Sequence, residues 1–165
     1  MSRSYDAREE RFGGFLENYQ PRDTFRHWPG KTITEADDHM FCLLTLASSP
    51  LHIDAHFAQE EMDSGRNVVV GTYIYSLLLG MSVPDISGRA IANLGVEKLQ
   101  HVAPLYHGDT LYGSSEVLST RVSLSRPDRG ILRVTTTGTN QDGIVVCWFT
   151  RSVMLPRLPD RVTPG

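Results

Sequence analysis

The chain has 165 residues, of which 40% are hydrophobic and 21% charged, as is typical of one globular domain with a sizeable core. Its formal net charge of -3 gives no electrostatic reason to expect nucleic-acid binding. No run of about 18 uninterrupted apolar residues predicts a membrane span, and the polar first residues lack a signal-peptide core, so we expect a cytoplasmic protein.

The two ends of the chain differ in composition from its middle. Residues 1–11 are highly charged, and residues 156–165 contain three prolines and little apolar content. Such segments bury little surface, so both are predicted to be flexible. No repeat or linker divides residues 12–155, which we expect to form one domain.

Strand and helix signals begin after the first flexible segment. Residues 24–34 carry apolar residues typical of a strand, interrupted by Pro29 and Gly30. Thr34 is a suitable helix N-cap, and the acidic residues after it suit the positive end of a helix dipole. The predicted helix ends near Ser49, because Pro50 disfavours helical geometry in the residue before it. One face of this helix is apolar and comprises Ala36, Met40, Leu43 and Leu44.

The stretch from 68 to 83 is apolar almost all round and is followed by Pro84. It is too long for a typical strand, so a fully buried helix is the better prediction. Strand-like runs rich in β-branched residues come next, at residues 90–105, 111–124, 131–139 and 144–155. Asp142-Gly143 between the last two runs indicates a hairpin. This order predicts an α+β hot-dog fold, in which one antiparallel sheet wraps around a central buried helix.

The segment from 43 to 58 is the strongest candidate for a catalytic site. A helix end, the Pro50 loop and His52 follow one another, an order that presents an imidazole at a fixed angle. Histidine titrates near neutral pH and can take or release a proton. A lone histidine beside apolar residues is more often packed and hydrogen-bonded, and Asp54 suits a helix cap as well as a site.

Pro50-Leu51-His52-Ile53-Asp54, with Ala58, resembles the second half of a known motif, Gly-Asp-any-Asn-Pro-aliphatic-His. That motif is typical of the MaoC-like (R)-specific enoyl-CoA hydratase/dehydratase family, which the chain resembles. Residues 66–72, 92–95, 108–112, 125–127 with 130–131, and 140–143 are similar to the branch that includes mesaconyl-CoA, itaconyl-CoA and methylmalyl-CoA hydratases or dehydratases. The resemblance covers roughly residues 12–155.

The resemblance implies a lyase that adds water to, or removes it from, a coenzyme A thioester. By position, the resemblance implies that His52 is the catalytic histidine. It also implies that the backbone N–H of Gly71, at the start of the central helix, donates a hydrogen bond to the thioester carbonyl. Gly71 also suits close packing of helix against sheet. Substrate contacts are implied for Thr72, Asn93 and Arg126, the last because arginine suits phosphate.

The sequence departs from the family where the motif has its catalytic Asp, which is Ala47 here. His52 then acts with Ser48, Ser49 or a substrate carboxylate that orders the water, or another group such as Asp54 or His56 supplies the proton transfer. The third alternative is an acyl-thioester-binding homologue with lost or altered catalysis.

A hot-dog thioesterase is the competing enzyme class, because Glu60, Glu61 and Asp63 precede the central helix. We expect no cofactor beyond the coenzyme A or acyl-carrier thioester and no metal, since the remaining histidines lack metal-ligand spacing; these are His27, His39, His101 and His107. Cys42 and Cys147 are expected to be buried, reduced thiols. Unpaired sheet edges predict a homodimer or a dimer of dimers.

Overall fold

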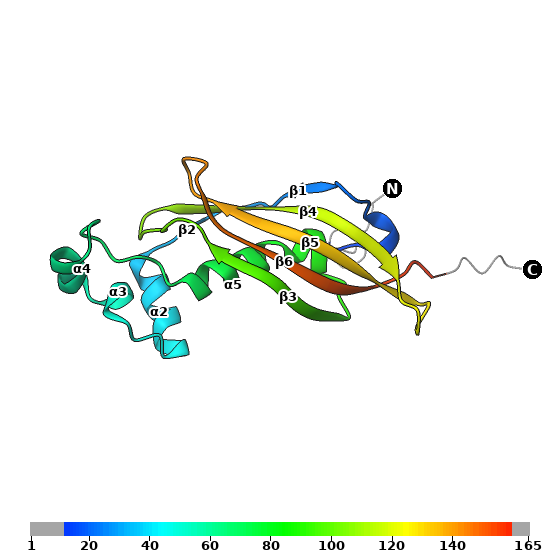
Figure 1. Cartoon of the computed structure of the whole chain (residues 1–165), viewed down its shortest axis with the longest axis horizontal. Coiled ribbons are helices and arrows are strands. Elements are labelled where there is room, and N and C mark those ends of the chain that lie inside the picture. The colour runs from blue at the N-terminus through cyan, green and yellow to red at the C-terminus, as the bar shows by residue number, and fades with distance from the viewer. Residues whose placement is uncertain (1–11, 160–165) are drawn as a thin grey trace, which may run out of the picture.

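The chain is organised around one antiparallel sheet in a computed structural model that describes residues 12–159. The sheet has the strand order β1-β4-β5-β6-β3, and β2 also pairs with β4 (Figure 1). The strands are β1 (Thr24–Arg26), β2 (Lys31–Thr32), β3 (Ala92–His101), β4 (Thr110–Val122), β5 (Arg129–Thr139) and β6 (Val145–Pro156). The helices are α2 (Glu35–Thr45), α3 (Pro50–Ile53), α4 (Ala55–Glu61) and α5 (Gly71–Met81), with single turns at Leu16–Asn18 and Val83–Ser87.

The long strands follow from alternation along the chain. In β5, every second residue is buried, and Leu132 and Val134 are fully buried on the face toward the core, as a half-buried strand requires. The predicted hairpin joins β5 to β6, where Asn140 Oδ1 accepts hydrogen bonds from the backbone N–H groups of Asp142 and Ile144. The strand predicted over residues 24–34 is interrupted at Pro29 and Gly30, as expected, and forms β1 and β2 on either side of them.

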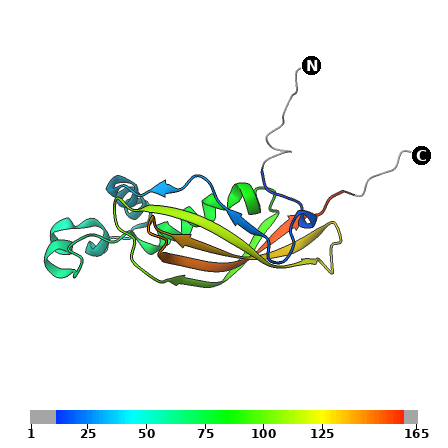
Figure 2. The same ribbon diagram turned by 90° about the horizontal axis from the view of Figure 1, so that it is seen from above.

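Helix α5 lies along the concave face of the sheet (Figures 1 and 2). Ile74 and Leu78 are buried in a core that also contains Phe149 of β6. Thr72, Ser76 and Gly80 are exposed at intervals of one turn. The helix is therefore central, but our prediction that it is buried all round was wrong for this stripe.

Helix α2 begins as predicted and ends earlier. Thr34 Oγ1 accepts a hydrogen bond from the Asp37 N–H, and the Asp37 carboxylate accepts one from the Thr34 N–H, which together form a capping box. The helix stops at Thr45, because Leu46 takes a left-handed conformation with φ 58°. Its predicted apolar face is exposed rather than buried, and includes Met40, Leu43 and Leu44.

The structure describes part of one predicted flexible end, residues 156–159, and none of the other. Residues 1–11 and 160–165 lie outside the described residues. Strand β6 includes Pro156, and beyond it the Arg157 side chain donates to a Glu17 carboxylate oxygen over 2.7 Å. Pro156 and Arg157 therefore contact the folded part of the chain. Within residues 12–159, no helix has the length and apolar character needed to cross a membrane.

Candidate functional site

His52 is held at the end of α3, in the short connection between α2 and α4. Pro50 occupies the first turn of α3, where a missing N–H and a fixed φ favour helix initiation. The His52 Nδ1 atom lies 2.8 Å from the carbonyl oxygen of Val68. Because a carbonyl oxygen only accepts, Nδ1 carries the hydrogen and Nε2 of the neutral ring is left with a lone pair.

A pocket of about 430 Å³ opens beside this imidazole, at the N-terminal end of α5. Its volume lies within the range of small-molecule sites. It brings together His52 and Gly71, which the sequence assigned to one site. The pocket is lined by His52, Val68, Val69, Gly71, Ile74, His101, Val102, Ala103, Pro104 and Leu105.

Gly71 is the first residue of α5, so its N–H has no acceptor within the helix and faces the end where anions are stabilised. A second imidazole lies against it. A Cβ atom added to Gly71 would come within 2.7 Å of His101 Nε2 and 2.8 Å of Cε1. The close approach that favours glycine here is therefore to His101, the last residue of β3.

His101 is the site residue that sequence reasoning missed. Its spacing from His52 carries no signal, because the two are brought together only when β3 folds back beside α5. The segment Val102–Leu105 that follows it also lines the pocket. In the part of the chain that the structure describes, the His101 side chain makes no hydrogen bond, and it is exposed.

Two buried polar side chains hold this end of the molecule together. Asn67 Nδ2 donates to the carbonyl oxygens of Pro50, Leu51 and Asp54, at 3.2, 2.9 and 3.1 Å. It therefore fixes the loop that carries His52 against the segment leading into α5. The two N–H groups of this amide share the three carbonyl oxygens, so one side chain connects α3 and Asp54 with the segment before α5.

Asp38 of α2 fixes the start of α5 itself. Its carboxylate is fully buried and accepts from the Val70 N–H at 3.1 Å and from His107 Nε2 at 3.0 Å. Val70 is the N-cap residue of α5, so this carboxylate satisfies one of the donors at the helix N-terminus. The neighbouring Gly71 is the first residue of α5 and lines the pocket.

The remaining proposed proton-transfer residues do not line the pocket. Ser48 is exposed and Ser49 is half-buried, and neither contributes to the pocket wall. Asp54 caps α4 by accepting from the Phe57 N–H at 3.0 Å, the structural role that the sequence left open. His56 is exposed on α4, and Ala47 also lies outside the lining.

The proposed substrate-contact residues are spread over the fold. Thr72 is exposed on α5, next to Gly71. Asn93 accepts from the buried Arg151 guanidinium at 2.8 Å, and Arg151 also bonds to Ser82 beyond the C-terminal end of α5. Burial lowers the pKa of Arg151. The structure thus does not bring Asn93 to the His52 pocket.

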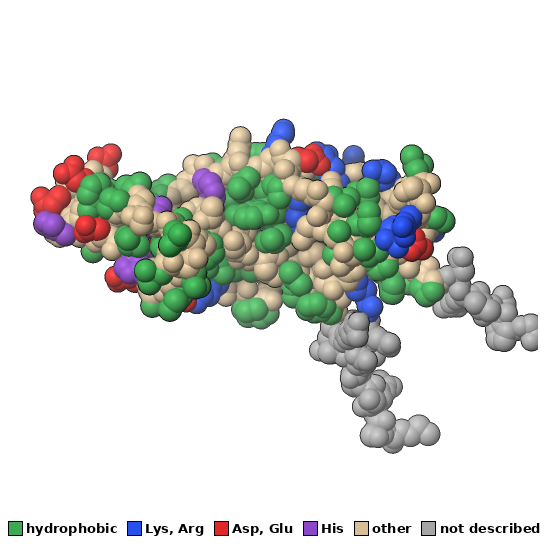
Figure 3. Space-filling view, turned by 90° about the horizontal axis from the view of Figure 1, so that it is seen from below, with side chains coloured by type: hydrophobic (Ala, Val, Ile, Leu, Met, Phe, Trp, Pro, Cys, Tyr) green, Lys and Arg blue, Asp and Glu red, His purple; other side chains and the backbone are tan. Residues whose placement is uncertain are grey.

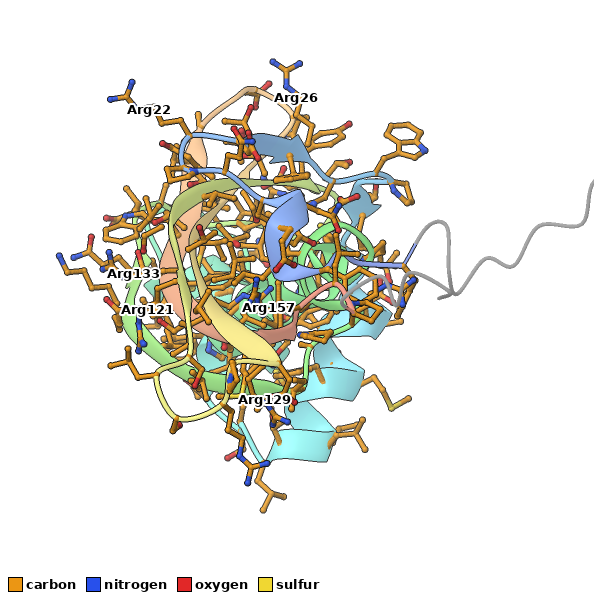
Figure 4. The ribbon with its side chains drawn as sticks, turned by 90° about the vertical axis from the view of Figure 1, so that its right-hand side faces the viewer. Arg22, Arg26, Arg121, Arg129, Arg133 and Arg157 are labelled. Atoms are coloured by element: carbon orange, nitrogen blue, oxygen red, sulfur yellow. The ribbon has the colours of Figure 1, made fainter. Side chains whose placement is uncertain are left out.

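Arg126 lies in the loop that joins β4 to β5. Arg121 and Arg129, which lie on either side of it in the chain, are both seen at the near end of the sheet in Figure 4, which views the molecule from the side away from α2, α3 and α4. Arg129 is paired with Asp128 at 2.7 Å. This loop is therefore at the opposite end of the molecule from the pocket.

The acidic and thiol groups named from the sequence also lie elsewhere. Glu60, Glu61 and Asp63 are outside the pocket lining. Cys42 and Cys147 are buried free thiols, as predicted, and burial raises the pKa of Cys147 to about 11. Among residues 12–159, no three His, Cys, Asp or Glu side chains are grouped to hold a metal.

A second polar cluster has the residue types of a hydrolytic triad. His27 Nδ1 lies 2.6 Å from Asp85 Oδ2, and His27 Nε2 lies 2.8 Å from Ser115 Oγ. Ser115 is buried and also bonds to Thr136. Since a nucleophile must reach its substrate, we interpret the cluster as structural: it connects His27, next to β1, with β4 and with the turn at Val83–Ser87.

Comparisons with known proteins agree with this fold. The mesaconyl-CoA hydratase family matches residues 2–165. The chain is 32% identical to a β-methylmalyl-CoA dehydratase from Chloroflexus aurantiacus over 158 residues, which is 92% of this chain and 44% of the relative. A crystal structure of a MaoC domain protein dehydratase from the same species has a TM-score of 0.83 at 31% identity, covering 93% of this chain and 45% of that one.

A Mycobacterium tuberculosis protein with a double hot-dog fold aligns with a TM-score of 0.72 at 24% identity, over 93% of this chain and 47% of that chain. This similarity confirms the predicted hot-dog architecture. The chain spans less than half the length of these relatives.

Proposed function

Because the chain belongs to the mesaconyl-CoA hydratase family, a branch of the MaoC-like dehydratases, we propose that it hydrates an enoyl-CoA thioester or dehydrates the corresponding 3-hydroxyacyl-CoA. One observation carries the proposal. The pocket contains both His52, with Nε2 available as a base, and Gly71, whose N–H at the start of α5 has no acceptor within the helix.

In the proposed reaction, His52 Nε2 removes a proton from water while the water oxygen bonds to the β-carbon of the thioester. The electron pair of the double bond moves toward the carbonyl oxygen, which becomes an enolate oxygen. The Gly71 N–H donates to that oxygen, and the α5 dipole adds to the stabilisation. The Val68 carbonyl keeps the imidazole in the required tautomer.

We further propose that the acyl group carries a second carboxylate. The family name and the dehydratase relative point to such thioesters. Because Ala47 replaces the motif carboxylate, a substrate carboxylate is one group that can order the attacking water. Neither Ser48 nor Ser49 lines the pocket, which disfavours the two hydroxyl groups for this role.

We also propose that a second copy of the chain pairs along β3. This strand ends the sheet, and nine of its ten residues are exposed, including Leu94, Val96 and Leu99. Hydrophobic side chains are exposed across the face seen from the β3 side in Figure 3. An unpaired edge favours pairing, and the double hot-dog relative is about twice as long. A monomer by light scattering at micromolar concentration would contradict the pairing.

The function is tested by mass spectrometry with crotonyl-, mesaconyl-, itaconyl- and branched enoyl-CoA thioesters. The proposal predicts that at least one gains the mass of water and that His52→Ala lowers the rate by about 10²–10⁴-fold. Release of free coenzyme A without hydration would instead identify a thioesterase. Binding without any reaction would identify an acyl-thioester-binding protein.

A further inference from the structure

We propose that His101 is the second catalytic acid–base residue of this pocket and that it transfers the proton at the α-carbon of the thioester. The inference rests on the proposed hydration. That reaction needs two proton transfers, one from the water and one to the α-carbon. His52 provides one imidazole, and Ala47 leaves the motif without its carboxylate.

The composition of the pocket wall supports this assignment. Its lining contains two ionisable side chains, His52 and His101, and the other lining residues are apolar or glycine. The other groups considered from the sequence, Asp54 and His56, do not line the pocket. Within residues 12–159, His101 is thus the remaining wall residue that can exchange a proton with a bound thioester.

The position of His101 defines which carbon it serves. Its Nε2 atom lies next to Gly71, within 2.7 Å of where a Cβ would be. The Gly71 N–H is the proposed donor to the thioester carbonyl oxygen. Since the α-carbon is bonded directly to the carbonyl carbon, an imidazole beside this donor is placed near the α-carbon.

The hydrogen bonds of the two imidazoles support the same division. His52 Nδ1 is engaged by the Val68 carbonyl, which leaves Nε2 as a proton acceptor for water. In the described part of the chain, His101 makes no hydrogen bond, and its side chain is exposed. Its ring nitrogens are therefore not held by another group of the described chain and can contact a substrate in the pocket.

His52 and His101 together account for both proton transfers of the reaction. The water oxygen bonds to the β-carbon, its proton passes to His52 Nε2, and the π electrons move to the carbonyl oxygen. The enolate collapses by forming the α-carbon–hydrogen bond with a proton from the His101 imidazolium. His52 releases its proton to solvent and His101 takes one up before the next turnover, and dehydration reverses each step.

The test compares His101→Gln and His101→Ala with the unchanged chain, using the thioester that the unchanged chain hydrates. His56→Gln is the matched control, because His56 is exposed on α4 and outside the pocket. His101→Gln is expected to lower kcat by about 10²–10⁴-fold, with thioester binding, measured by calorimetry, changed less than threefold. Added imidazole is expected to restore part of the rate of His101→Ala, because the pocket is open to solvent.

A His101→Gln rate within threefold of the unchanged chain would overturn the inference while leaving the proposed function intact. So would a folded His101→Ala variant whose lost rate imidazole does not restore, since that result indicates a packing role. If the unchanged chain hydrates no thioester in the panel, the proposed function fails and the role of His101 fails with it. Circular dichroism of each variant separates these results from misfolding.

Discussion

Two substitutions of Gly71 separate the shape of the pocket from its backbone hydrogen-bond donor. Gly71→Ala adds a Cβ and keeps the N–H, whereas Gly71→Pro adds a Cβ and removes the N–H. Proline is tolerated at the first position of a helix, and the preceding Val70 has the extended backbone, φ -61° and ψ 128°, that a following proline requires. Both variants are therefore expected to fold.

The magnitude of the alanine effect follows from the contact with His101. The added Cβ would lie 2.7 Å from His101 Nε2, and an ordinary contact is about 3.5 Å, so the ring must move by roughly 0.8 Å. A displacement of about 1 Å at a reacting group lowers rates by up to about 10²-fold. We therefore expect Gly71→Ala to reduce kcat by about 10- to 100-fold. Thermal stability should be unchanged or slightly raised, because the exposed ring moves freely and alanine favours the helix.

Gly71→Pro should lower kcat by about a further 10²–10³-fold, the usual effect of losing one donor to a developing oxyanion. Gly80→Ala is the control, since a Cβ there meets nothing within 4 Å. It should stabilise the chain by up to about 1 kcal/mol and leave kcat unchanged. The assays are thioester hydration and urea unfolding of all three variants. Equal rates for Gly71→Pro and Gly71→Ala would refute the assignment of the Gly71 N–H as the oxyanion donor.

Three further predictions concern groups outside the pocket. Lys31 lowers the pKa of Asp37 from 3.8 to about 2. The stability that this carboxylate provides is therefore complete above pH 4 and is lost as the pH falls toward 2. In urea unfolding, the free energy of unfolding of Asp37→Asn should fall less between pH 4 and pH 2 than that of the unchanged chain. Because burial raises the pKa of Cys147 to about 11, a thiol reagent at neutral pH should label Cys147 only after denaturation, and labelling of the folded chain would contradict this. His27→Ala should lower the free energy of unfolding by about 2–4 kcal/mol without slowing hydration, and labelling of Ser115 by a serine-directed phosphonate would show instead that the cluster is reactive.

Local patterns predicted the parts of the fold that depend on neighbouring residues. The Thr34 cap, the hairpin at residues 140–143 and the alternation in β5 each arise within a few positions, and the structure confirms them. The apolar residues of α2 were assigned correctly to one side of a helix, and the structure leaves Met40, Leu43 and Leu44 on that side exposed. A helical repeat shows which residues share a face, and it does not show what covers that face.

The same distinction applies to the candidate site. His52 and Gly71 were placed together because the family resemblance assigns both to one site, and both line the pocket. His101 carries no such signal, since its position beside Gly71 depends on how β3 packs against the start of α5. Asp38, which bonds to the Val70 N–H, was missed for the same reason, because its carboxylate resembles any acidic residue in the first turn of a helix.

The central claim is that His52 directs water to the β-carbon of a thioester. The most direct measurement is to run the reaction in heavy-oxygen water with the unchanged chain and with His52→Ala, and to locate the label by mass spectrometry. We expect the label in the β-hydroxyl group of the product, and we expect His52→Ala to form this labelled product about 10²–10⁴-fold more slowly than the unchanged chain. Label in a free carboxylate, or unchanged hydration by His52→Ala, would contradict it.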